Sequence, residues 1–101
     1  MTQHSTPVFS TVGIVGTGAM GRGIAQIAAQ AGSRVVLFDA APDAANKART
    51  AISQQWTKLV EKGRVTEFEA ASRAARLHVA HSVHDLAACD LVVEAIVENL
   101  K

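Results

Sequence analysis

The stretch GTGAMGRG, residues 16–23, places four glycines within eight residues. It directly follows the apolar run VGIV, residues 12–15, which is typical of a strand buried on both faces of a sheet. Residues 19–31 then carry apolar side chains at helical spacing, and Gly32 suits the position just after a helix. Glycine is unfavourable inside regular structure, so this cluster indicates that the connection between strand and helix has a special requirement.

Three of these glycines have the spacing Gly-x-Gly-x-x-Gly of a dinucleotide-binding loop. Gly16 allows the tight turn, Gly18 lets a pyrophosphate approach the backbone, and Gly21 lets the helix pack closely on the strand. Gly23 is expected to add further close packing. The helix N-terminus offers N–H groups and a partial positive charge to the phosphates. A nucleoside triphosphate loop fits less well, because Arg22 and Gly23 stand where that loop needs Lys and Ser or Thr.

An acidic residue follows the second predicted strand, RVVLF, residues 34–38. Asp39 lies 18 residues after Gly21, near the spacing of about 20 at which an acid hydrogen-bonds the adenosine ribose. Its carboxylate would repel a 2′-phosphate. Ala40 and Ala41 come next, so no arginine is placed to receive one. The sequence therefore favours NAD over NADP.

The rest of the chain continues the alternation of strands and helices. We predict helices from Pro42 to about Lys62 and from the capping-box pattern at 66–69 to about Arg76, strands over 77–80 and 90–96, and a weakly capped helix opening at Ser82. Ile52, Trp56 and Leu59 mark one face of the long helix, and Trp56 is expected in the core.

This alternation predicts an α/β fold, a Rossmann-type doubly wound parallel sheet with covering helices. Right-handed crossovers favour the strand order 3-2-1-4. Residues 1–10 are expected to be a flexible tail, and residues 11–101 a truncated Rossmann domain. The expectation of truncation rests on the fourth strand, which would leave an apolar sheet edge open.

Composition narrows the functional classes. The hydrophobic content of 49% and charged content of 19% are those of an ordinary globular domain. A net charge of +1 gives no reason to expect nucleic acid or an acidic membrane as partner. No apolar run approaches the roughly 20 residues that a membrane span needs. The single cysteine, Cys89, cannot form an internal disulfide, which suits a cytoplasmic location.

Three histidines, His78, His81 and His84, recur every three residues. On one helix this spacing would gather metal ligands. A strand over 77–80 followed by a helix from Ser82 would turn the rings in different directions, whereas zinc needs convergent ligands. We therefore predict no metal site and no catalytic base among them.

Three segments resemble the N-terminal part of the 3-hydroxyacyl-CoA dehydrogenases, including the bacterial 3-hydroxybutyryl-CoA dehydrogenases. They are VGIVGTGAMGRGIAQIAAQAG (residues 12–32), VVLFD (35–39) and DLVVEAIVENLK (90–101). Hydroxyisobutyrate-type dehydrogenases share part of the glycine pattern, whereas EAIVENLK, residues 94–101, is more specific. The resemblance runs from about Thr11 to Lys101. It implies NAD as cofactor and oxidation of the 3-hydroxyl of an acyl-CoA to a ketone, with hydride transfer to NAD.

The resemblance also implies roles for individual residues. It assigns the pyrophosphate to Gly16, Thr17, Gly18, Ala19, Met20 and Gly21, the adenosine ribose to Asp39, the wall of the cofactor cleft to the backbone of Ala95 and Ile96, the nicotinamide-side ribose to Glu98, and CoA to Lys62. Gln55 stands where some members have a CoA-contacting serine. That contact is not carried over.

The catalytic residues of the family are expected outside this chain. The family's histidine–glutamate pair comes after the fourth strand, as does the helical domain that closes the substrate site and forms the homodimer. The chain alone is therefore expected to be inactive. The alternatives are a stand-alone dinucleotide-binding module, a related hydroxy-acid dehydrogenase, a methyltransferase with a similar glycine loop and an FAD enzyme.

Overall fold

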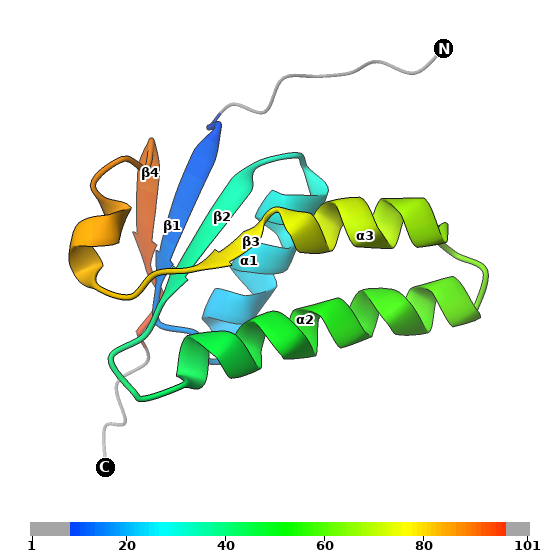
Figure 1. Cartoon of the computed structure of the whole chain (residues 1–101), viewed down its shortest axis with the longest axis horizontal. Coiled ribbons are helices and arrows are strands. Elements are labelled where there is room, and N and C mark those ends of the chain that lie inside the picture. Colours follow the sequence, from blue (N-terminus) through cyan, green and yellow to red (C-terminus); the bar gives the residue numbers. More distant parts are fainter. Residues whose placement is uncertain (1–8, 97–101) are drawn as a thin grey trace.

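Strands alternate with helices along residues 9–96, the part of the chain that the structure, a computed structural model, describes. In chain order the elements are β1 (Thr11–Val15), α1 (Ala19–Gln30), β2 (Arg34–Phe38), α2 (Ala44–Glu61), α3 (Glu67–Ala75), β3 (Leu77–Val79), the 3₁₀ turn η1 (Val83–Leu86) and β4 (Leu91–Glu94). The strands form one parallel sheet in the order β3-β2-β1-β4 (Figure 1). The Rossmann-type fold and the strand order 3-2-1-4 predicted from the sequence are confirmed.

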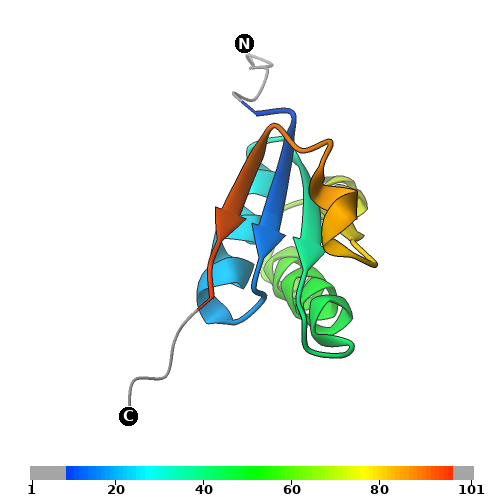
Figure 2. The same cartoon turned by 90° about the vertical axis from the view of Figure 1, so that its left-hand side faces the viewer.

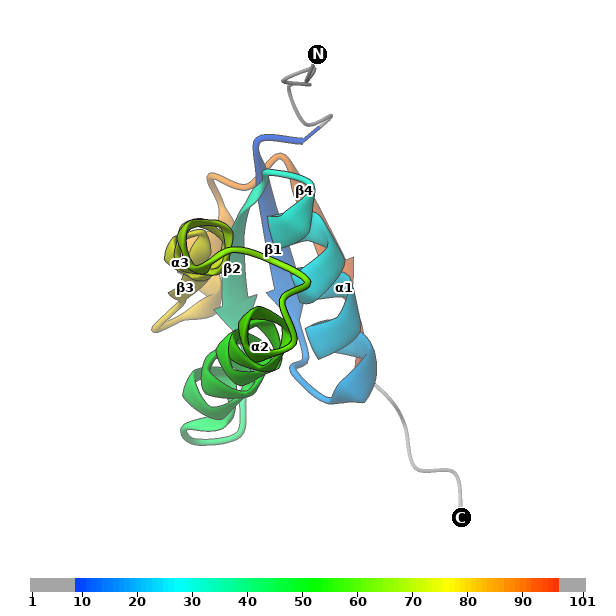
Figure 3. The same cartoon turned by 90° about the vertical axis from the view of Figure 1, so that its right-hand side faces the viewer.

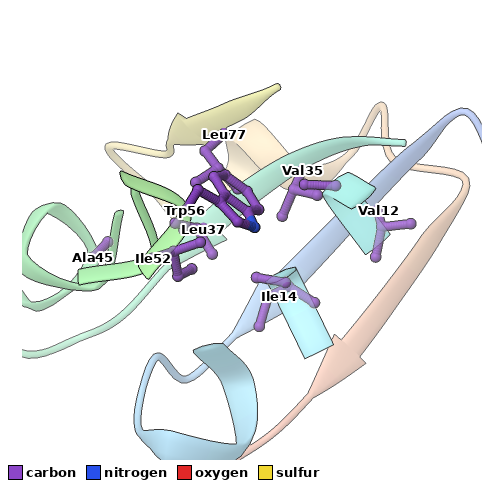
Figure 4. Packing of buried hydrophobic residues seen from close by; sticks show 10 residues of the cluster. Val12, Ile14, Val35, Leu37, Ala45, Ile52, Trp56 and Leu77 are labelled. Carbon is purple, nitrogen blue, oxygen red and sulfur yellow. The ribbon is translucent and has the colours of Figure 1, made fainter. Parts of the chain in front are cut away.

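One face of the sheet is apolar and carries the core. In the parallel register Val12 lies beside Val35, and Ile14 beside Leu37, so these four side chains share a face and all are buried. Helices α1 and α2 lie against this face (Figure 3). Trp56 of α2 is fully buried in the same cluster (Figure 4), as predicted, and its Nε1 donates to Gln30 Oε1 at 3.0 Å.

The opposite face of β1 carries Gly13, for which the sequence pattern predicts no role. A Cβ at this position would lie 2.9 Å from Leu86 Cδ2 and 3.0 Å from Cys89 Sγ. The absence of a side chain therefore lets the η1 segment pack directly on the central strand. In Figure 2 this segment lies beside the sheet, away from α1.

Four predicted elements differ from the observed ones in their ends or in their type. Helix α2 begins at Ala44, because Asp43 has a φ of 65° and interrupts the helical backbone, so Pro42 lies in the preceding turn. The helix expected from Ser82 is only a 3₁₀ turn. Strand β3 ends at Val79, one residue earlier than predicted. Strand β4 spans only Leu91–Glu94, and Ala95 and Ile96 follow it as irregular chain.

Helix α3 begins with the capping box that the sequence predicted. Thr66 Oγ1 accepts from Glu69 N at 3.0 Å, and Thr66 N donates to Glu69 Oε1 at 2.9 Å. Helices α2 and α3 form an antiparallel pair that extends away from the sheet (Figure 1). No helix within residues 9–96 combines the length and the apolar character that crossing a membrane requires.

Candidate functional site

The connection between β1 and α1 is only three residues long. Gly16 has a φ of 100°, the left-handed conformation that glycine adopts without strain. Its N–H donates to the Phe38 carbonyl at 2.9 Å, which ties the loop to the end of β2. A Cβ on Gly16 would lie 3.1 Å from the carbonyl carbon and oxygen of Ala95. The loop is thus held between the ends of the two neighbouring strands.

Gly21 and Gly23 both lie in α1, but their surroundings differ. A Cβ on Gly21 would overlap the Gly16 carbonyl oxygen and lie 3.3 Å from Ile14 Cγ2, so α1 packs directly on the loop and strand. Apart from its chain neighbours and the backbone of its own helix, no atom of residues 9–96 lies within 4 Å of a Cβ built on Gly23. The expectation that Gly23 adds close packing is wrong, because Gly23 lies on an exposed face of α1.

Gly18 leaves the start of α1 open. Within the described residues no atom other than those of its two chain neighbours approaches a Cβ built on it to 4 Å, and no side chain caps the helix. The first turn carries no acidic side chain. The first N–H groups of a helix lack intrahelical partners and carry partial positive charge. This end of α1 therefore presents bare backbone donors suited to an anion.

Asp39 lies at the carboxyl end of β2 and reaches across to this loop. Its Oδ2 accepts from both Thr17 N and Thr17 Oγ1 at 2.8 Å, and its Oδ1 accepts from Ala41 N at 2.9 Å. The backbone bond from Ala41, followed by that from Thr17, lowers the pKa of Asp39 below its ordinary value of 3.8. The carboxylate is therefore ionised at neutral pH.

The carboxyl ends of β1, β2 and β4 enclose a cleft of about 450 Å³. Six of the residues predicted to bind the cofactor line it: Gly16, Thr17, Gly18, Asp39, Ala95 and Ile96. Ala95 is buried and its N–H donates to the Val15 carbonyl at 2.8 Å, which holds this segment beside β1 after β4 ends. In open α/β sheets, ligands bind at this edge of the sheet, where the strand order reverses.

The other predicted cofactor residues lie beside the cleft or beyond the described chain. Ala19, Met20 and Gly21 form the first turn of α1 and are not among the lining residues. Glu98 lies outside the described residues. The cleft is also lined by Val15, Phe38 and Ala40, for which the sequence pattern predicted no role in the site. Their position at or just after the end of a predicted strand was the one sequence feature that could have indicated this.

The structure does not bring Lys62 into this cleft. Lys62 is exposed and lies just after the C-terminal end of α2. The loop after Asp39 leads instead into the N-terminal end of this helix. The 18 residues of α2 correspond to about 27 Å of helix. Gln55 lines a separate hollow between α1 and α2, together with Arg22.

The three histidines belong to different parts of the chain: His78 to β3, His84 to η1, and His81 to the segment between them. Among the residues described, no three His, Cys, Asp or Glu side chains gather as metal ligands. Burial, and then the nearby Arg34 and Arg49, lower the pKa of His78 from its ordinary value of 6.5. None of the three histidines lines the cleft.

Comparison with known proteins identifies relatives for nearly all of this chain. Residues 11–101 match the family model described as "3-hydroxyacyl-CoA dehydrogenase, NAD binding domain". A probable 3-hydroxybutyryl-CoA dehydrogenase of Deinococcus radiodurans is 44% identical over 86% of this chain and 31% of its own length. The 3-hydroxybutyryl-CoA dehydrogenase of Bradyrhizobium diazoefficiens is 41% identical over 91% of this chain and 31% of its own.

A solved structure gives the same picture. The crystal structure of (S)-3-hydroxybutyryl-CoA dehydrogenase from Ralstonia eutropha matches 91% of this chain and 32% of its own, with a TM-score of 0.83 and 41% identity. The chain thus spans about a third of the length of the relatives it matches. The description of the matching family names NAD as the ligand, in agreement with the cofactor predicted from the sequence.

Proposed function

This chain belongs to the 3-hydroxyacyl-CoA dehydrogenase family, whose NAD-binding domain it matches over residues 11–101, and we propose that it serves as the NAD-binding part of such an enzyme. The proposed reaction oxidises the 3-hydroxyl of an acyl-CoA to a ketone. When bound, NAD accepts the hydride. This chain's residues bind and orient the dinucleotide. The relatives named 3-hydroxybutyryl-CoA dehydrogenase support this assignment.

The observation that carries the proposal is the pairing of an open helix start with an acid on the next strand. Gly18 exposes uncapped N–H groups of α1 to the cleft, which fits a pyrophosphate. Asp39 lines the same cleft from the end of β2, which fits a ribose. The described residues therefore fit a dinucleotide, with diphosphate and sugar recognised by two adjacent strand ends.

The charge of Asp39 supports NAD over NADP. The lowered pKa of its carboxyl keeps it negative at neutral pH, so a 2′-phosphate beside it would be repelled. Ala40 and Ala41 follow in the turn and offer no positive side chain to offset that repulsion. Asp39 is thus the proposed selectivity residue for the adenosine ribose.

Titration of the chain with NADH and with NADPH, followed by nucleotide fluorescence, tests this proposal. We expect NADH to bind more tightly than NADPH. Asp39→Asn should weaken NADH binding about tenfold, because it replaces a charged acceptor by a neutral amide. Asp43→Asn makes the same chemical change four residues along, outside the cleft, and is expected to leave NADH binding unchanged. Equal affinity of the native chain for both nucleotides, or no binding of NADH, would contradict the proposal.

A role for Lys62 in binding CoA is a separate part of the proposal. Lys58, Lys62 and Arg64 place positive charge around the end of α2, where CoA phosphates would find ion-pairing partners. In an enzyme containing this domain, Lys62→Ala is expected to raise the KM for acyl-CoA about fivefold with kcat unchanged. The same basic residues also complement the negative C-terminal end of the helix. An unchanged KM would leave only this structural role.

We further propose that the general base lies outside this chain. Asp39 is the one titratable side chain on the lining of the cleft within residues 9–96, and it is assigned to the ribose. The chain alone is then inactive, and NADH formation from a 3-hydroxyacyl-CoA by this chain would contradict the assignment.

Homodimerisation through a further helical domain, and a cytoplasmic location consistent with the single cysteine, belong to the same proposal.

A further inference from the structure

We propose that Thr17 is a positioning residue for cofactor selectivity, which holds the Asp39 carboxylate in the orientation that distinguishes NAD from NADP. This inference rests on the proposed function, because it concerns the same cleft. The resemblance to the dehydrogenase family implies only that Thr17 belongs to the pyrophosphate loop. The structure adds a distinct task, performed through Asp39 rather than through direct contact with phosphate.

The geometry that carries the inference is a double hydrogen bond from one residue to one oxygen. Thr17 N and Thr17 Oγ1 both donate to Asp39 Oδ2 at 2.8 Å. Thr17 is buried, with 7% of its surface exposed, so the hydroxyl is screened from competing water. A backbone donor and a side-chain donor of the same residue define the direction of the carboxylate more strictly than one flexible contact.

The remaining hydrogen-bonding capacity of Asp39 follows from counting acceptor positions. An ionised carboxylate has about four such positions on its two oxygens. Thr17 fills two on Oδ2, and the Ala41 N–H fills one on Oδ1. One position on Oδ1 therefore remains for a ligand. A ribose hydroxyl can donate to it, whereas a 2′-phosphate is an acceptor with negative charge and cannot.

Loss of the Thr17 hydroxyl should free the Asp39 carboxylate to change its orientation while keeping its negative charge. In Thr17→Val the backbone N–H remains, but Oδ2 loses its second donor and the carboxylate can turn. The hydrogen bond to the hydroxyl also contributes to the lowered pKa of Asp39. The variant should therefore lose NADH affinity at a higher pH than the native chain, an effect that a purely structural threonine would not produce.

The experiment measures dissociation constants for NADH and NADPH by fluorescence between about pH 3 and 8, a range that extends below the ordinary pKa of 3.8 for Asp39. Thr17→Val is expected to raise the NADH Kd about tenfold, to bring the NADPH and NADH constants closer together and to move the acid limit of binding upward. Thr17→Ser retains the hydroxyl and should stay within about twofold of the native constants. If Thr17→Val fails to fold, Thr17→Ala removes the same hydroxyl without adding a methyl group.

Thr57→Val is the matched control. Its Oγ1 donates to the Ser53 carbonyl at 3.1 Å on the exposed side of α2, so the chemical change is the same but remote from Asp39. Native selectivity and an unmoved acid limit in Thr17→Val would overturn the inference while leaving the proposed function intact. If Thr17→Val weakens NADH and NADPH binding equally and the pH at which NADH affinity is lost does not change, Thr17 only shapes the loop. A native chain that binds neither nucleotide would contradict the proposed function itself, and the inference with it.

Discussion

At the scale of single residues, Gly21 sets how closely α1 approaches β1. A methyl group there would overlap the Gly16 carbonyl, which belongs to the backbone and cannot turn aside. We expect Gly21→Ala to destabilise the fold by about 2 kcal/mol or more, as overpacking does, and to weaken NADH binding. The midpoint of thermal unfolding measures the first effect.

Gly23→Ala is the matched control for that substitution. The position lies in the interior of α1, and no described atom beyond that helix's own backbone and the chain neighbours of Gly23 lies within 4 Å of the added carbon. Alanine is the better helix former, so this variant should be stabilised by about 0.5–1 kcal/mol. An equal change in the unfolding midpoint for the two substitutions would contradict a special packing role for Gly21.

The sequence predicts those residues of the candidate site that are recognised by local spacing. Gly16, Gly18, Gly21 and Asp39 follow from spacing along a strand, a turn and a helix. Gly13 could not be assigned, because its neighbours Leu86 and Cys89 come some seventy residues later. The two hydrogen bonds from Thr17 to Asp39 could not be predicted from the sequence either, because they depend on how β1 and β2 lie side by side.

At the scale of elements, the capping box decides where α3 begins. Thr66→Ala removes the acceptor for Glu69 N and should lower the free energy of unfolding by about 1 kcal/mol. Amide hydrogen exchange should accelerate in the first turn of α3. Thr57→Ala, in the interior of α2, serves as the control and is expected to be neutral or slightly stabilising. Unchanged exchange in α3 of Thr66→Ala would contradict the assigned cap.

Element existence was predicted better than element ends. Apolar periodicity and the Thr66 pattern identified α1, α2 and α3, because burial of one helical face acts over many residues. The start of α2 was missed because the left-handed Asp43 depends on a local turn that Pro42 does not reveal. The segment after Ser82 forms only the 3₁₀ turn Val83–Leu86, and it packs on β1 through Leu86 and Cys89, a contact with Gly13 that local sequence does not reveal.

At the scale of the whole molecule, the shifted pKa values define the pH range of stability. The native pKa of His78 lies below its ordinary 6.5, and those of Asp39 and Asp85 lie below 3.8. The unfolded chain therefore binds these protons more tightly, and stability falls as the pH drops below each ordinary value. Burial raises the pKa of Cys89 above 9.0, so its contribution is lost as the pH rises past that value.

We accordingly expect the unfolding temperature to be highest between pH 6.5 and pH 9.0. Between about pH 6.5 and 5.5 the decline should come from His78. His78→Gln should flatten this part of the curve, whereas His84→Gln, at an exposed position of η1, should not. A native chain whose unfolding temperature is constant over this interval would contradict the assignment.

The sheet order was predictable at this scale because crossover handedness leaves few topologies for parallel strands. The packing of the η1 segment on the sheet face opposite α1 and α2 was not predictable, because it depends on the contact of that segment with Gly13. The position of Lys62 relative to the cleft was also beyond the sequence. It depends on the direction in which α2 leaves the sheet, and that direction takes its C-terminal end away (Figure 1).

The central claim is that a dinucleotide lies over bare backbone at the start of α1, with its ribose at Asp39. Titration of the isotopically labelled chain with NAD, followed by the amide signals of each residue, tests this claim most directly. The account predicts that the largest shifts occur at Thr17–Gly21, at Asp39–Ala41 and at Ala95. Shifts concentrated elsewhere, or none at saturating NAD, would contradict it.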